Sequence, residues 1–235
     1  MFIWLRSTLP QFASYLSSFK TDPNCECVIV NISSLPVYIY LITANWFTLL
    51  VSFSLYAVII VFLYNIYKTT AELRQFDFRP WRTRLNKRAL LLMVIGAVII
   101  VALAFGYAKL TAVWHITESG NERALDLLLR KNPVAMTLDA VIFGPIAEEL
   151  SFRGFFFSYV LSDQYLDREY QAATIVINGL LFGYLHSGNS LVPLAYYTLF
   201  GMVLGTIYLL SKHDIRVNSV THMLANLGIL WLVPS

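Results

Sequence analysis

Six long apolar stretches constrain the fold of this chain more than any other feature of its sequence. A helix needs roughly 20 predominantly apolar residues to cross a bilayer, within a range of about 17–25. We therefore expect an all-α, polytopic membrane protein with about six transmembrane helices. The candidate spans lie at about residues 41–66, 88–110, 134–160, 172–186, 193–210 and 217–233.

The composition agrees with a membrane protein. Hydrophobic residues make up 57% of the 235 residues and charged residues 13%, whereas soluble domains average about 45–50% apolar and about 25% charged residues. Aromatic residues reach 15%, and Trp and Tyr concentrate at membrane interfaces. We expect a multi-pass integral protein of the inner or plasma membrane whose partner is the lipid bilayer, with no nucleic-acid partner and no signal for an oligomeric state.

Two membrane regions are expected along the chain. Residues 1–130 form an N-terminal region with two spans and interfacial segments, and residues 131–235 form a membrane core with four spans. Residues 1–19 and 118–132 are each predicted to lie as amphipathic segments at a membrane surface. Together with the spans, these segments give seven or eight helical elements.

The distribution of Lys and Arg predicts the orientation. Residues 67–88 contain seven of the 17 Lys and Arg residues, the densest basic run in the chain, and basic loops stay in the cytoplasm. With six spans, residues 161–171 and 211–216 are then also cytoplasmic, and both termini are not. The segment 118–132 falls on the opposite surface.

Strongly polar side chains inside the last four spans follow a common spacing. An ionisable residue within a span indicates a functional site by default. Asp139 lies near the start of its helix, where the helix dipole favours an acid, and we interpret it as structural. The others form three patterns with polar or aromatic ends four residues apart: Glu148-Glu149-x-x-x-Arg153, Phe182-x-x-x-His186 and His222-x-x-x-Asn226.

Helix geometry gives the two adjacent glutamates different partners. Residues four apart share a helix face, so Glu149 and Arg153 can form an ion pair in which two buried charges compensate each other. Glu148 is rotated by about 100° from Glu149 and points elsewhere. A carboxylate, two imidazoles and a carboxamide from three helices can then converge, with the carboxylate as general base and the other groups as oxyanion donors.

These motifs resemble a known family. EELSFR, FGYLH and HMLAN resemble the E-E-x-x-x-R, F-x-x-x-H and H-x-x-x-N motifs of the CPBP intramembrane proteases, which include type II CAAX prenyl endopeptidases and abortive-infection and bacteriocin-immunity proteins. The resemblance covers roughly residues 134–233 and implies an endopeptidase acting near the membrane. It implies that Glu148 activates water with His186, that His222 and Asn226 stabilise the oxyanion, and that Glu149 and Arg153 orient the site.

Two questions about the chemistry stay open in the sequence. Glu148, His186 and His222 could supply a His2Glu zinc set with an open water position. A metal-free glutamate mechanism uses the same residues, and we favour it, with no cofactor required.

We expect a membrane-embedded or lipidated peptide substrate. The alternatives are a non-catalytic membrane immunity or binding protein that keeps the motif as a polar core, and a small transporter, against which no inverted repeat is detectable.

The expected depth of His186 in the membrane does not fit a simple set of spans. At 1.5 Å per residue, Glu148 and His222 fall at similar depths, but His186 falls too far towards the outside. Either the fourth helix begins earlier, within residues 167–173, or the third helix breaks near Pro145.

Overall fold

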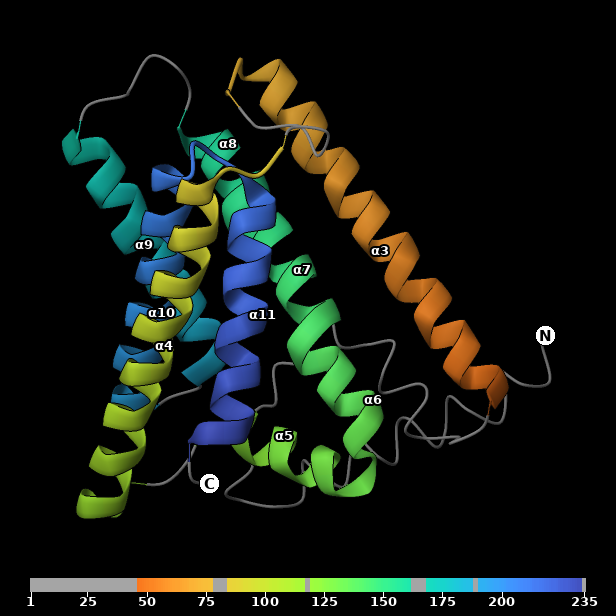
Figure 1. Ribbon diagram of the computed structural model, residues 1–235, viewed down its shortest axis with the longest axis vertical. Helices are drawn as coiled ribbons and strands as arrows, with labels where there is room; N and C mark the ends of the chain where they lie inside the picture. The colour runs from red at the N-terminus through yellow and green to blue at the C-terminus, as the bar shows by residue number, and fades with distance from the viewer. Residues whose placement is uncertain (1–45, 78–83, 117–118, 162–167, 188–189, 234–235) are drawn as a thin grey trace.

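The computed structural model describes residues 46–77, 84–116, 119–161, 168–187 and 190–233. Within these ranges the chain is helical and contains no strand, as the all-α prediction requires (Figure 1). The interfacial segment predicted at residues 1–19 lies outside them. The elements are α3 (Trp46–Leu73), α4 (Lys87–Trp114), α5 (Gly120–Lys131), α6 (Pro133–Leu138), the π-helical segment η2 (Asp139–Phe143), α7 (Gly144–Glu149), the π-helical segment η3 (Leu150–Phe155), α8 (Phe156–Val160), α9 (Arg168–Ser187), α10 (Leu191–Leu210) and α11 (Ile215–Leu232).

Three of the described helices are long and apolar enough to cross a membrane. They comprise Phe47–Leu73, Lys87–Trp114 and Leu191–Leu210. Large apolar side chains on their outer faces, such as Phe62, Val98 and Leu199, are exposed, and contiguous exposed apolar surface is typical of a membrane contact. Helices α9 and α11 are of similar length, but the Asn and His side chains that they carry lower their hydropathy. The count of six spans therefore stays a prediction.

The surface helix expected at residues 118–132 is α5, which lies across one end of the bundle (Figure 1). It begins at a capping box: the Ser119 side chain accepts from the Glu122 backbone N–H, and the Glu122 carboxylate accepts from the Ser119 N–H. Such reciprocal bonds satisfy two backbone donors that a helix start leaves open. The opposite end of the bundle holds the end of α3 and the start of α4.

The helical run from α6 to α8 carries the glutamates and passes through Pro145 without breaking. The N–H of Gly144 bonds to the carbonyl of Asp139, five residues back, which widens this turn into the π-helical segment η2. A second π-helical segment, η3, follows Glu149 directly. Such π-bulges are frequent at functional sites, and here they enclose the two-turn segment that bears both glutamates.

The wide π-helical turn leaves the Ala140 carbonyl without a backbone donor, and a neighbouring helix supplies one. The Gly144 N–H is committed to Asp139, and Pro145 has no N–H to donate to Ala140. The side chain of Asn226, on α11, supplies that donor, with 2.8 Å between its Nδ2 and the Ala140 carbonyl oxygen. Thus the expected alternative of a break at Pro145 is wrong: a side chain from α11 satisfies the carbonyl.

The other alternative, a fourth helix that begins earlier, agrees with the structure in the start of that helix. Helix α9 begins at Arg168, within residues 167–173 and four residues before the expected start of that span. His186 lies near the C-terminal end of α9, where its Nε2 is 3.7 Å from Glu148 Oε1 on α7.

Glycines allow α9 and α10 to pack closely. A Cβ at Gly183 would lie 2.8 Å from the Thr198 nitrogen and 2.9 Å from the Leu194 carbonyl oxygen. A Cβ at Gly201 would lie 3.0 Å from the Gly179 Cα. Small residues at helix interfaces let backbones approach in this way, so the path of α9, and with it His186, is fixed against α10.

Asp139 has a different environment from the one expected. It lies seven residues into the helical run, is 5% exposed, and accepts a hydrogen bond from the Tyr56 hydroxyl of α3. The structural interpretation is retained, but its basis is this tyrosine instead of the helix dipole. The bond connects α3 to the helix that carries the glutamates.

Candidate active site

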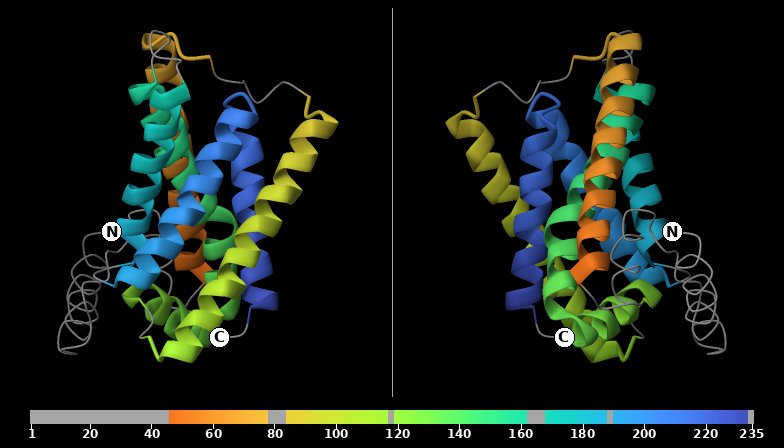
Figure 2. Two further views of the ribbon diagram at one scale, coloured as in Figure 1. Left: turned by 90° about the vertical axis from the view of Figure 1, so that its left-hand side faces the viewer. Right: turned by 90° about the vertical axis from the view of Figure 1, so that its right-hand side faces the viewer.

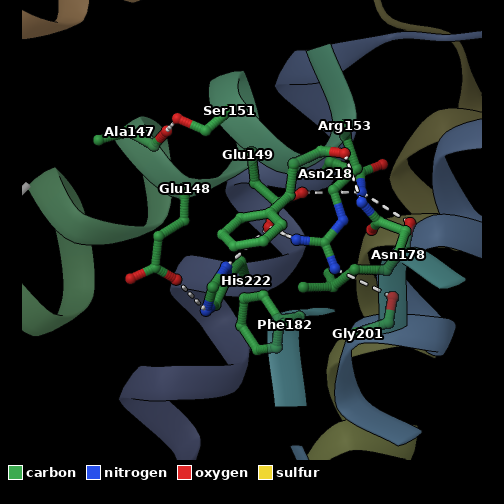
Figure 3. A network of polar contacts seen from close by, with 12 residues as sticks. Ala147, Glu148, Glu149, Ser151, Arg153, Asn178, Phe182, Gly201, Asn218 and His222 are labelled. Atoms are coloured by element: carbon green, nitrogen blue, oxygen red, sulfur yellow. Dashed lines mark hydrogen bonds and ion pairs between the residues drawn. The ribbon is translucent and has the colours of Figure 1, made fainter. Parts of the chain in front are cut away.

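The two adjacent glutamates point in different directions from α7, as Figure 3 shows. Glu149 forms an ion pair with Arg153, with 3.0 Å between Oε1 and the guanidinium NH1, and both side chains are fully buried. Glu148 instead faces the two histidines and has 13% of its side chain exposed. The different partners expected from helix geometry are therefore present.

Glu148 and both histidines come together from three helices. The Nε2 atom of His186, on α9, lies 3.7 Å from Glu148 Oε1, and the Nε2 atom of His222, on α11, lies 3.9 Å from Glu148 Oε2. Both separations exceed the usual 2.7–3.2 Å of a direct hydrogen bond. The Glu148 carboxylate thus lies beside one ring nitrogen of each histidine.

The other ring nitrogen of each histidine is held by an acceptor. His222 Nδ1 lies 2.9 Å from Glu149 Oε1, and His186 Nδ1 lies 2.8 Å from the Phe182 carbonyl oxygen. Because ionised carboxylates and carbonyls only accept hydrogen bonds, we assign a hydrogen to Nδ1 in both rings. Each Nε2 is then directed at Glu148.

Glu149 connects more groups than the sequence predicts. Its Oε1 accepts from Arg153 and from His222, and its Oε2 accepts from Asn218 Nδ2 at 3.1 Å. The Asn218 amide also donates to the Leu204 carbonyl oxygen at 2.7 Å. One carboxylate therefore orients an arginine, an imidazole and an amide at once (Figure 3).

Arg153 is fixed on its other side by α10 and by an aromatic ring. Its NH2 group donates to the Gly201 carbonyl oxygen at 2.9 Å, and its guanidinium carbon lies 5.0 Å from the centre of the Phe182 ring. A cation over an aromatic face is stabilised by the ring quadrupole. These contacts compensate the burial of its charge beyond the ion pair alone.

Sequence reasoning missed two asparagines in this network. Asn218 precedes His222 by four residues on α11, and Asn178 precedes Phe182 by four residues on α9. Asn178 Nδ2 donates to the Phe152 carbonyl oxygen in η3 at 2.8 Å. The signal was available, because both residues extend by one turn the four-residue spacings that identified the motifs.

The predicted oxyanion donor Asn226 has a structural partner. It follows His222 by one turn on α11 and donates to the Ala140 carbonyl, as described above. An amide nitrogen carries two hydrogens, so this bond leaves the capacity for a second. Its position one turn beyond His222 is as the spacing predicts, while its role in catalysis stays a prediction.

The donor set does not form a recognisable metal site. Within the described residues, no group of three or more His, Cys, Asp or Glu side chains is placed to hold a metal ion. Whether Glu148, His186 and His222 act with or without a zinc ion stays a prediction.

The fold and site of the described residues define an all-helical protein that combines three membrane-capable helices with a polar network of two glutamates, two histidines and an arginine, most of it buried. Residues 130–228 match the family model of Type II CAAX prenyl endopeptidase Rce1-like proteins. This match supports the CPBP intramembrane protease family for the segment that it covers and a CAAX-type protease function in general. All three motifs lie inside the matched segment. Comparison with curated proteins and with solved structures gives no match.

Proposed function

We propose that this protein is an intramembrane endopeptidase with six spans that hydrolyses a peptide bond of a membrane-associated protein or peptide, with prenylated substrates as one class. The observation that carries the proposal is the position of Glu148, which faces His186 Nε2 at 3.7 Å and His222 Nε2 at 3.9 Å. A general base acts on its substrate directly or through one water. Glu148 meets that requirement because it faces the Nε2 atoms of His186 and His222, which can bind the same water.

In the proposed reaction, Glu148 removes a proton from a water molecule that His186 helps to hold. The water oxygen attacks the carbonyl carbon of the scissile peptide bond and forms a tetrahedral intermediate. When the carbon–nitrogen bond breaks, Glu148 returns the proton to the leaving amine. The products are a carboxylic acid, which then ionises in water, and an amine, and the enzyme recovers its starting protonation state.

His222 and Asn226 are proposed to stabilise the oxyanion. Because His222 Nδ1 donates to Glu149, His222 can also donate from Nε2 only as an imidazolium. The carboxylate of Glu149 then balances part of that charge, as it does for Arg153. Two carboxylates, one guanidinium and one imidazolium give a site without net charge, which lowers the cost of burying all four groups.

Glu148 is also the feature that favours catalysis over a purely structural core. Glu149, Arg153 and Asn218 form a network of direct hydrogen bonds that holds three helices together. The separations from Glu148 to the histidines are longer and the side chain is partly exposed. A purely structural core needs direct hydrogen bonds such as those of Glu149. It gains little from the longer separations around the partly exposed Glu148.

The proposal is tested with protein purified into nanodiscs and a set of membrane-associated peptides. Pairs of peptides with and without a prenylated cysteine establish whether the lipid matters. Glu148→Gln removes the base and retains nearly the same shape, so cleavage should fall to the background level while the protein remains folded. Undiminished cleavage by Glu148→Gln would overturn the assignment of the base.

A further inference from the structure

We propose that Tyr197, on α10, is a positioning residue that holds the His186 imidazole in its orientation towards Glu148, and that Glu122 of the surface helix α5 holds Tyr197. The proposal rests on the function proposed above only for its effect on activity. The geometric part stands on contacts around His186 that the motifs do not include.

The His186 ring contacts two aromatic rings. The Phe182 ring, one turn earlier on α9, is stacked on it at 4.2 Å between centroids with an interplanar angle of 22°. The Tyr197 ring lies at 5.3 Å with an angle of 30°. The Phe182 carbonyl fixes the Nδ1 edge, and the two rings restrict rotation about the remaining side-chain bonds.

Tyr197 is itself anchored from outside the motif region. Its hydroxyl donates to Glu122 Oε1 at 3.3 Å. The other oxygen, Glu122 Oε2, accepts from the Ser119 N–H at 2.8 Å and from the Tyr107 hydroxyl at 3.0 Å. The carboxylate that caps α5 thus binds tyrosines of both α4 and α10.

This chain of contacts connects a surface helix to the site. Helix α5 lies at the end of the bundle where α9 ends and α10 begins (Figure 2). Its capping carboxylate fixes the hydroxyl end of Tyr197, and the ring of Tyr197 contacts the ring of His186. The expected consequence is an imidazole whose Nε2 stays directed at Glu148 before substrate arrives.

The experiment compares Tyr197→Leu, Tyr197→Phe and the control Tyr107→Phe. Tyr107→Phe removes the other hydroxyl from Glu122 and keeps the ring that stacks on Tyr196, so it does not alter the contacts of His186. Two readouts are used: kcat/KM for peptide cleavage, and imidazole ¹⁵N chemical shifts of His186, assigned by their loss in His186→Gln. The shifts report tautomer and order without requiring activity.

We expect Tyr197→Leu to mix the two neutral tautomers of His186 and to lower kcat/KM by up to about 100-fold, the cost of misplacing a catalytic group by about 1 Å. Tyr197→Phe should show a smaller change in both readouts, because the ring remains but loses Glu122. Tyr107→Phe should leave the His186 signals unchanged.

Unchanged His186 shifts in a folded Tyr197→Leu protein would overturn the proposal. If Tyr197→Leu does not fold, Tyr197→Phe decides: identical His186 signals in the Tyr197→Phe and Tyr107→Phe proteins would reject the anchoring role. If the parent protein cleaves no peptide, the proposed function fails on its own, and the shifts still test the geometry.

Discussion

His222 Nδ1 lies 2.9 Å from Glu149 Oε1, the same oxygen that accepts from Arg153 at 3.0 Å. The second glutamate of the motif is therefore the orienting group for a histidine as well as the partner of an arginine. This arrangement gives the two glutamates different contacts: Glu149 holds Arg153 and His222, whereas Glu148 faces the two histidines and is the base in the proposed reaction. Each part of this division leads to a measurable difference.

The first prediction compares Glu148→Gln with Glu149→Gln. Loss of a general base typically lowers the rate by about 10²–10⁴-fold, so we expect Glu148→Gln to be inactive and stable. Glu149→Gln leaves the fully buried Arg153 without its ion-pair partner, and breaking a buried pair costs about 3–5 kcal/mol of folding free energy. Thermal unfolding in detergent, measured beside cleavage, separates the two. Equal loss of stability in both variants would contradict the division of roles.

The second prediction concerns Asn218, which the motifs do not contain. Asn218→Leu removes donors from Glu149 Oε2 and from the Leu204 carbonyl, and unsatisfied buried acceptors cost about 1–3 kcal/mol. Cleavage should also fall, because Glu149 then holds His222 less firmly. Asn178→Leu is the matched control, since it loses its bond to Phe152 but no contact with Glu149. A loss of stability of the same size with a larger loss of cleavage in Asn178→Leu would argue against this role.

Local geometry made part of the site predictable. The pairing of Glu149 with Arg153 follows from a spacing of four residues on one helix, and helix geometry fixes that spacing regardless of the rest of the fold. The same geometry turned Glu148 away from this pair. The contacts of Glu149 with His222 and Asn218 join residues about 70 positions apart, so they depend on how α11 packs against α7.

The course of the chain at Pro145 shows why some features are not readable from the sequence. A proline inside a helix removes a donor and favours a break or a kink. Whether the helix continues depends on another donor for the Ala140 carbonyl, and that donor, Asn226, lies on α11. Similarly, the position of His186 beside Glu148 depends on the glycine packing of α9 against α10.

The third prediction tests the glycine packing that positions His186. Gly183→Ala places a methyl group 2.8 Å from the Thr198 nitrogen, so α9 and α10 must separate. We expect a loss of about 1–3 kcal/mol, as for overpacking in other cores, together with reduced cleavage. Gly106→Ala is the control, because a Cβ there has nothing within 4 Å and alanine is the better helix former by about 1 kcal/mol. Thermal unfolding of the two variants should therefore shift in opposite directions.

The fourth prediction concerns metal removal. Prolonged treatment with EDTA should leave the cleavage rate unchanged, and added Zn²⁺ should not increase it, because the proposed reaction uses only side chains of the protein, those of Glu148, His186, His222 and Asn226. Elemental analysis of the purified protein provides the control for residual metal. Activity that disappears on chelation and returns with one added metal would reject the metal-free reaction and favour a zinc set of these three residues.

The last prediction separates two roles of Asn226, which satisfies a carbonyl and is proposed to stabilise the oxyanion. Asn226→Ala should lower stability by about 1–3 kcal/mol through the unsatisfied Ala140 carbonyl. It should also lower kcat by about 10²–10³-fold if an oxyanion donor is lost. Activity alone does not distinguish these effects, because a displaced helix also reduces cleavage.

Pro145→Ala provides the distinction, because it introduces a backbone N–H that the π-helical turn directs at the Ala140 carbonyl. In the double variant Asn226→Ala with Pro145→Ala, we expect stability to return towards the parent value, since the carbonyl regains a donor. Cleavage should remain low, because no backbone group replaces the amide beside the substrate. Recovery of both properties would make Asn226 a purely structural residue, and a double-mutant cycle on unfolding and on kcat measures the coupling directly.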